Sequence, residues 1–88
     1  MADILQDICD ESLRANGKYG PHSSTHEALG VLLEEFDELK DAIHANSAER
    51  IQNEAIQVAS VAFRLAIACS EGDPQFYDRS GLNRAPRQ

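Results

Sequence analysis

The sequence is poor in positive charge: eight lysines and arginines stand against fifteen aspartates and glutamates, for a formal net charge of −7. Binding to duplex nucleic acid depends on clustered basic residues that neutralise the backbone phosphates. The acidic balance therefore argues against a duplex nucleic-acid binder. It is compatible with a nucleotide ligand, because a bound cation can bridge carboxylates to phosphates.

Cysteine is scarce too, with Cys9 and Cys69 as the only two. Their spacing offers no cysteine-based metal site. Both fall at apolar positions of expected helices, so we interpret them as small buried hydrophobic residues in a reducing compartment. A disulfide bond between them is an alternative that no feature of the sequence favours.

Long apolar segments and a basic leader are also lacking. The longest apolar stretch, residues 55–69, contains Gln57, Ser60 and Arg64, so it does not span a bilayer. Two of the first seven residues are acidic, where a signal peptide has its basic region. We therefore expect a cytoplasmic protein that has no membrane partner.

The 88 residues correspond to one domain, and a domain this small buries a limited core. Residues 1–71 have helical periodicity and form the expected single helical domain. Residues 72–88 contain two glycines and two prolines with little periodicity, which is typical of an extended or disordered tail. A chain of this size often needs a metal, a disulfide or a partner chain for stability.

The periodicity predicts an all-α fold, a bundle of three main helices. The first covers residues 2–16 and ends at an Asn-Gly stop signal. The second runs over residues 25–45, after an N-cap at Ser24 that a glutamate three residues later completes as a capping box. The third, over residues 47–70, begins at a second serine cap.

The apolar residues of the second and third helices predict how the bundle packs. The expected core stripe of the second helix consists of Leu29, Leu32, Phe36, Leu39 and Ile43. The third helix is apolar on two sides and has one narrow polar stripe, which contains Asn53, Gln57, Ser60 and Arg64. A helix that is apolar on two sides must be covered on both. We therefore expect a homodimer or homotetramer with the third helix at the interface.

Acidic and amide residues recur at a three-residue spacing on both of these helices. Glu35 and Glu38 lie ~60° apart on the second helix, and Glu54 and Gln57 repeat the spacing on the third. The first pair shares a face with small apolar residues, which favours a site that faces inward. Carboxylates at a buried seam are costly unless they are neutralised, and oxygen ligands from facing helices suit Mg²⁺ or Mn²⁺. The alternative is a solvated acidic face, a description that fits Glu34 well.

The expected loop over residues 17–24 combines a cation, an aromatic ring and an imidazole, in Lys18, Tyr19 and His22. Beside a carboxylate cluster, such a mixture can meet the phosphates and base of a nucleotide, although each residue alone is more often ordinary surface. Arg64, on the polar stripe of the third helix, can also reach a phosphate. A salt bridge from Arg64 to a neighbouring acid is the alternative.

The two spaced pairs together resemble a family signature. Glu35-x-x-Glu38, fifteen residues and then Glu54-x-x-Gln57 are similar to the ExxE…ExxD signature of the MazG-like all-alpha nucleotide pyrophosphohydrolases. The chain departs from the family pattern at one position, because it has Gln57 where the family has aspartate. A glutamine can offer a carbonyl oxygen to a metal, but it brings no charge.

The flanking sequence extends the resemblance. The stretch over residues 18–27 and the run Leu-Leu-Glu-Glu-Phe-Asp-Glu-Leu over residues 32–39 are similar to short phage and bacterial members of the family. The similarity extends over about residues 10–70, which is most of the chain. It implies the all-α fold of these pyrophosphohydrolases in an oligomer.

The resemblance also implies hydrolysis of a nucleoside triphosphate to the monophosphate and pyrophosphate, with Mg²⁺ or Mn²⁺ as cofactor. The implied metal ligands are Glu35, Glu38, Glu54 and, as a weakened fourth position, Gln57. The implied catalytic residues are Glu34, Glu35 and Glu38. Either Glu34 or Glu35 would orient the attacking water. The residues implied to bind substrate phosphates are Lys18, His22 and Arg64.

Two other functions are open at this point. The change from aspartate to glutamine is compatible with a catalytically weakened or inactive helical module that binds a nucleotide or a protein partner without turnover. The third hypothesis is a structural homo-oligomer whose acidic residues form only a solvated face. Metal titration separates this third hypothesis from the others, and turnover separates the first two.

Overall fold

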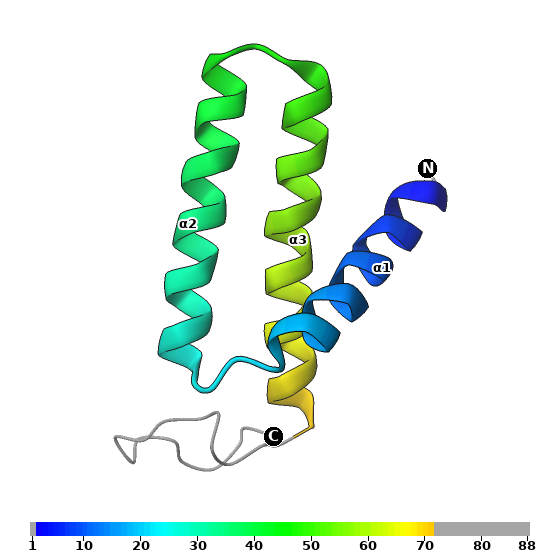
Figure 1. The fold of residues 1–88 in the computed structure, drawn as a ribbon, viewed down its shortest axis with the longest axis vertical. Helices are drawn as coiled ribbons and strands as arrows, with labels where there is room; N and C mark the ends of the chain where they lie inside the picture. Colours follow the sequence, from blue (N-terminus) through cyan, green and yellow to red (C-terminus); the bar gives the residue numbers. More distant parts are fainter. Residues whose placement is uncertain (1, 72–88) are drawn as a thin grey trace.

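The computed structural model describes residues 2–71, and these residues form three α-helices and no strand. The helices are α1 Ala2–Tyr19, α2 Thr25–His44 and α3 Ala48–Ser70 (Figure 1). The prediction of an all-α fold with three main helices is therefore confirmed for the described residues. No helix among them is long and apolar enough to cross a membrane. The expected tail over residues 72–88 lies outside the described part of the chain.

Helices α2 and α3 run antiparallel as a hairpin and pack against each other (Figure 1). In the turn between them Asn46 has a φ of 59°, a left-handed conformation that asparagine adopts more readily than most residues. The Asn46 N–H donates to the Ile43 carbonyl at 2.9 Å. Ser47 is the N-cap of α3, as predicted, because its side chain accepts a hydrogen bond from the Arg50 N–H at 3.3 Å.

The N-terminus of α2 also begins at its predicted cap. The Ser24 hydroxyl accepts a hydrogen bond from the Glu27 N–H at 3.0 Å. The second bond differs from that of a capping box, because the Glu27 carboxylate accepts the N–H of Ser23 and not that of Ser24. Together the two bonds define where the loop ends and α2 begins.

The end of α1 differs from the prediction. The helix continues through Gly17 and ends at Tyr19. Gly20 follows with a φ of 77°, and its N–H donates to the Asn16 carbonyl at 2.9 Å. The stop signal is therefore Gly20 and not Gly17, because a helix ends where a glycine adopts the left-handed conformation and Pro21 prevents continuation.

Helix α3 is the common partner of the other two helices. It packs against α2 and against α1, whereas α1 and α2 do not pack on each other. In Figure 1, the N-terminal end of α1 points away from the hairpin, and the C-terminal half of α1 lies against α3. Within the described residues, the orientation of α1 therefore depends on a short contact with α3.

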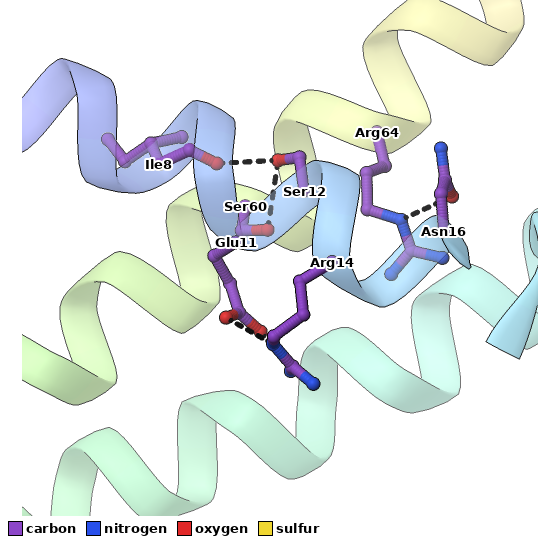
Figure 2. Close-up of polar contacts among 7 residues, drawn as sticks. All are labelled: Ile8, Glu11, Ser12, Arg14, Asn16, Ser60 and Arg64. Atoms are coloured by element: carbon purple, nitrogen blue, oxygen red, sulfur yellow. Dashed lines mark hydrogen bonds and ion pairs between the residues drawn. The ribbon is translucent and has the colours of Figure 1, made fainter. Parts of the chain in front are cut away.

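That contact is made by small and polar side chains (Figure 2). Ser12 and Ser60 are buried and their hydroxyl oxygens lie 3.0 Å apart. The Ser12 hydroxyl donates to the Ile8 carbonyl at 2.8 Å, so Ser60 supplies the proton of the bond between the two hydroxyls. Ala15, one turn after Ser12, is buried as well. The polar stripe predicted for the third helix thus faces α1 rather than solvent at Ser60.

The predicted core stripe of α2 is wrong at three of its five positions. Leu29, Phe36 and Ile43 are 49%, 56% and 52% exposed, whereas Ala28 and Ala42 are fully buried against α3. The small side chains form the inner face because they allow the two helices to approach closely, and the larger side chains then lie outside. Glu35 lies on the same face of α2 as the small side chains, so it also points inward, as predicted from its small apolar neighbours.

The interpretation of the cysteines as buried residues is also wrong, because Cys9 and Cys69 are both exposed. Cys9 forms no disulfide bond. For Cys9 the reason for this exposure is that, among the described residues, only α3 packs on α1, so most of the apolar stripe of α1 has no partner within residues 2–71. Leu5 and Leu13 on the same stripe are 65% and 72% exposed.

The packing of α2 on α3 generates a stability prediction. Ala42→Leu adds three carbon atoms to a position with no free surface, so it should lower the free energy of unfolding by about 1–3 kcal/mol. Chemical denaturation followed by circular dichroism measures the change. Ala55→Leu, at an exposed position of α3, is the matched control and should have a much smaller effect. Equal effects would show that Ala42 is not at a tight helix contact.

Candidate metal centre

Three carboxylates converge between α2 and α3. Glu35 and Glu38 extend from α2 and Glu54 from α3, and one oxygen of each lies within 4.8 Å of the others. Glu35 and Glu54 are half-buried, while Glu38 is exposed. The structure thus brings together three of the four residues implied as metal ligands.

Two oxygens of this cluster are buried without a hydrogen-bond partner, Glu35 Oε1 and Glu54 Oε1. A buried carboxylate oxygen that loses water without gaining a donor destabilises the fold. None of the residues that the structure describes donates a hydrogen bond to either atom. A proton or a cation would relieve both oxygens at once.

Burial also changes the pKa values of these carboxyl groups. Burial raises the pKa of the Glu35 carboxyl, and the charge of Glu38 is the next largest cause. Smaller contributions come from three further carboxylates, Glu54, Glu34 and Glu11. Burial likewise raises the pKa of Glu54, and Glu38 is again the second cause. The cluster therefore resists carrying its full negative charge.

These observations fit a hard divalent cation. Mg²⁺ and Mn²⁺ prefer oxygen ligands, and the three side chains offer oxygens close enough together to share one ion. The two buried oxygens without partners are atoms that an ion would satisfy. A solvated acidic face, the alternative interpretation, does not account for buried oxygens.

A polar cavity of about 430 Å³ lies beside the cluster and meets it at Glu35. Five of the residues implied by the resemblance line it, namely Glu34, Glu35, Gln57, His22 and Arg64. They come from α2, from α3 and from the loop between α1 and α2. The cavity therefore brings carboxylates and cationic groups to one site.

Lys18 is not brought to this cavity. It is exposed in the last turn of α1, and its ammonium nitrogen lies 5.2 Å from the centre of the Tyr19 ring. A cation over an aromatic face at an exposed site contributes little, about 0.5–1 kcal/mol. Tyr19 itself lines the cavity, although the sequence favoured it less than Lys18.

Two cavity residues on α1, Glu11 and Arg14, were not predicted from the sequence. The Arg14 guanidinium donates to the Glu11 carboxylate, with Nε and Oε1 2.8 Å apart (Figure 2). This hydrogen bond is the main reason why the pKa of Glu11 is lowered, and the nearby amide of Gln57 lowers it further. The only available signal was the three-residue spacing of an acid and a base, which does not distinguish a site from surface.

His22 and Arg64 face the cavity in different ways. His22 is half-buried, and burial followed by the nearby charge of Arg64 lowers its pKa, with an opposing effect from Glu27. The Arg64 side chain donates to two neutral oxygens, those of Asn16 and Gly20, at 3.0 and 3.1 Å. The salt bridge to an acid that the sequence left open is thus replaced by hydrogen bonds to the end of α1.

Comparison with protein-family models, with curated proteins and with solved structures finds no match to this chain. The functional argument therefore depends on the residues of the cluster and of the cavity.

The raised pKa values generate a prediction for stability in metal-free buffer. A carboxyl whose pKa is raised above its usual 4.5 stabilises the fold below pH 4.5, and this contribution is lost as pH rises through the raised value. Glu35→Gln and Glu54→Gln should therefore raise the melting temperature at pH 7 and have little effect at pH 4. Asp37→Asn removes an exposed carboxylate of the same helix as Glu35 and serves as control. A similar response in all three variants would contradict a local effect of the cluster.

Proposed function

We propose that this chain is a metal-dependent nucleoside triphosphate pyrophosphohydrolase of the MazG-like type, acting in the cytoplasm. The proposal is supported chiefly by the convergence of Glu35, Glu38 and Glu54, two of which have buried oxygens without partners. The polar cavity that begins at Glu35 adds support, because its volume of about 430 Å³ falls in the range typical of small-molecule sites.

Glu35, Glu38 and Glu54 would hold Mg²⁺ or Mn²⁺. When bound, such an ion polarises the phosphoryl group and offsets the charge that develops as the bond breaks. Gln57 lines the cavity next to Glu35 and offers a neutral carbonyl oxygen as a fourth donor. The chain itself thus supplies three negative charges towards the cation, one fewer than the family signature.

The substrate phosphates would occupy the polar cavity. Arg14 lines it and keeps a guanidinium in place through its bond to Glu11, so it provides positive charge in an acidic molecule. His22 on the opposite loop offers an imidazole that burial keeps largely neutral, and it can donate one hydrogen bond to a phosphate oxygen. Lys18 is not assigned a role, because it does not line the cavity.

The attacking water would be oriented by Glu34 or Glu35, which are adjacent on α2 and both line the cavity. The raised pKa of Glu35 applies to the metal-free protein, and a bound cation would lower it. Whichever of the two carboxylates is ionised would accept the proton as the water oxygen attacks phosphorus and the bond between the α- and β-phosphates breaks, which releases pyrophosphate. Glu34 is exposed at the cavity edge, where it can hold the water by a hydrogen bond.

A second candidate is a helical module that binds a nucleotide without turnover. The observation in its favour is the neutral side chain of Gln57, which lies near Glu11 and helps to lower the pKa of that carboxyl. A neutral amide contributes less to a cation than the aspartate of the family signature. Both candidate functions use the same site, and they differ only in whether the bound nucleotide is hydrolysed.

The first experiment measures metal binding and turnover. Calorimetric titration should detect binding of Mg²⁺ or Mn²⁺, and Glu38→Gln should weaken it by roughly tenfold or more, because affinity depends on the number of charged ligands. Asp37→Asn removes the same charge outside the cluster and is the control. Pyrophosphate release from a panel of nucleoside triphosphates measures activity, and Glu54→Gln should abolish it. Equal weakening by Glu38→Gln and Asp37→Asn would exclude a metal site at the cluster.

The same titration on Gln57→Asp separates the two candidate functions. The added carboxylate should tighten metal binding and, in an enzyme, accelerate pyrophosphate release, although the shorter side chain offsets part of the gain. Tighter metal binding without turnover by either form would replace the enzyme with the binding module. No change in metal binding would show that position 57 does not contribute to the ion.

We also propose that the chain associates with a second copy of itself through α3. Phe63 and Ile67 are each 40% exposed on α3, and the buried apolar core of the described residues contains only the small side chains Ala15, Ala28, Ala42 and Val61. Such a core is too small to account for a stable helical domain without further burial. A second copy supplies the same apolar face and would cover these residues symmetrically.

Self-association is tested by sedimentation equilibrium at micromolar concentration. The mass should be at least twice 9.7 kDa. Phe63→Asp and Ile67→Asp should dissociate or unfold the assembly, because a buried unpaired charge is strongly destabilising. Gln52→Asp places the same charge at an exposed polar position of α3 and should leave the mass unchanged. A fully helical monomer in the unmodified protein would exclude the proposal.

A further inference from the structure

The segment between α1 and α2 has a separate anchor on α3. Arg64 Nε donates to Asn16 Oδ1 at 3.0 Å, and Arg64 Nη2 donates to the Gly20 carbonyl at 3.1 Å (Figure 2 shows the first bond). The Gly20 N–H in turn donates to the Asn16 carbonyl at 2.9 Å. Two hydrogen bonds thus connect one residue of α3 with the last turn of α1 and with the residue that follows α1, and a third bond joins these two partners to each other. We call these three residues the Arg64 junction.

The loop needs such an anchor because the helices on either side of it do not pack together. Gly20 has a φ of 77°, which reverses the chain direction and turns its carbonyl towards α3. At its other end the loop is held by the bonds of Ser24 and Glu27 at the start of α2. Between these two ends, Arg64 is the one residue of α3 that donates a hydrogen bond to the loop within residues 2–71.

The position of His22 follows from this anchor, because it lies two residues after Gly20. His22 and Arg64 both line the polar cavity, and both also line a second cavity of about 420 Å³ between α1 and α3. The second cavity is largely apolar, with Leu13, Phe63 and Ile67 in its wall. His22 and Arg64 therefore lie in the wall that separates the apolar cavity from the polar cavity.

We propose that Arg64 is a positioning residue that holds the loop over residues 20–24, and with it His22, at the wall of the polar cavity. It therefore does not act as a ligand of a substrate phosphate. The functional consequence rests on the proposed pyrophosphohydrolase activity, whereas the junction itself does not. The role of Arg64 differs from that of Arg14, whose guanidinium faces the same cavity without a bond to the loop.

The chemistry of the junction requires an arginine. The guanidinium presents Nε–H and Nη2–H in a rigid fork, so one side chain can bond to a side-chain oxygen and a backbone carbonyl that lie in different directions. A lysine keeps the charge but concentrates its donors on one nitrogen and cannot reproduce the fork. Arg64→Lys therefore separates the geometry of the junction from its charge.

The experiment compares Arg64→Lys and Asn16→Ala with the unmodified protein by NMR. Each variant removes a bond of the junction, so amide exchange at Gly20 should accelerate about fivefold, the factor that corresponds to one hydrogen bond of ordinary strength. The imidazole of His22 should become better solvated, and its pKa should rise towards the usual value. Arg14→Lys is the matched control and should leave Gly20 exchange unchanged. Circular dichroism verifies that each variant keeps its helices.

Asn16→Ala decides whether Arg64 positions the loop or binds a substrate phosphate, because this variant leaves Arg64 itself intact. For a positioning residue, Asn16→Ala and Arg64→Lys should change Gly20 exchange and His22 titration alike and should raise KM for the nucleotide more than they lower kcat. Unchanged exchange and titration in Asn16→Ala would overturn the proposal. Absence of turnover in the unmodified protein would contradict the proposed function alone, and the NMR measurements would still decide whether the junction holds the loop.

Discussion

The fold and the candidate site depend on one constraint, the close approach of α2 to α3. Ala28 and Ala42 have no exposed surface, and only side chains this small allow two helix backbones to pack so tightly. The same contact places Glu35 and Glu54 in the seam, where two of their oxygens lose water without gaining a donor. The packing that stabilises the hairpin therefore creates an electrostatic cost at its centre. A cation would offset this cost, which links the stability of the hairpin to a ligand.

Helix α3 connects this hairpin to the rest of the described chain, since α1 has no direct contact with α2. The contact of α1 depends on polar groups, the hydroxyl pair of Ser12 and Ser60 and the bonds of Arg64. Such bonds are directional, whereas apolar contacts are not, so they specify the orientation of a helix that buries little apolar surface. The orientation of α1 in turn determines which of its residues face the polar cavity.

The local features of this structure and the pairing of the second and third helices could be predicted from the sequence, but the face that α2 turns inward and the crossing of α1 could not. The caps at Ser24 and Ser47 follow from spacing along single helices, and the convergence of three glutamates follows from the expected pairing of α2 with α3. The outward position of Phe36 does not, because two faces of α2 are apolar and the choice between them depends on the shape of α3. Glu11 was missed for a similar reason, since the crossing of α1 over α3 is set by contacts between residues 48 positions apart in the sequence.

The position of α1 offers a physical reason for the neutral side chain of Gln57. An aspartate there would face Glu11 across the cavity, and two carboxylates in contact repel each other. The amide of Gln57 is neutral and instead helps to lower the pKa of Glu11, whose charge is already balanced by Arg14. The neutral side chain at position 57 is thus matched by a carboxylate on another helix. The described residues direct three carboxylates towards one another between α2 and α3 and keep a fourth, Glu11, as part of an ion pair at the cavity wall.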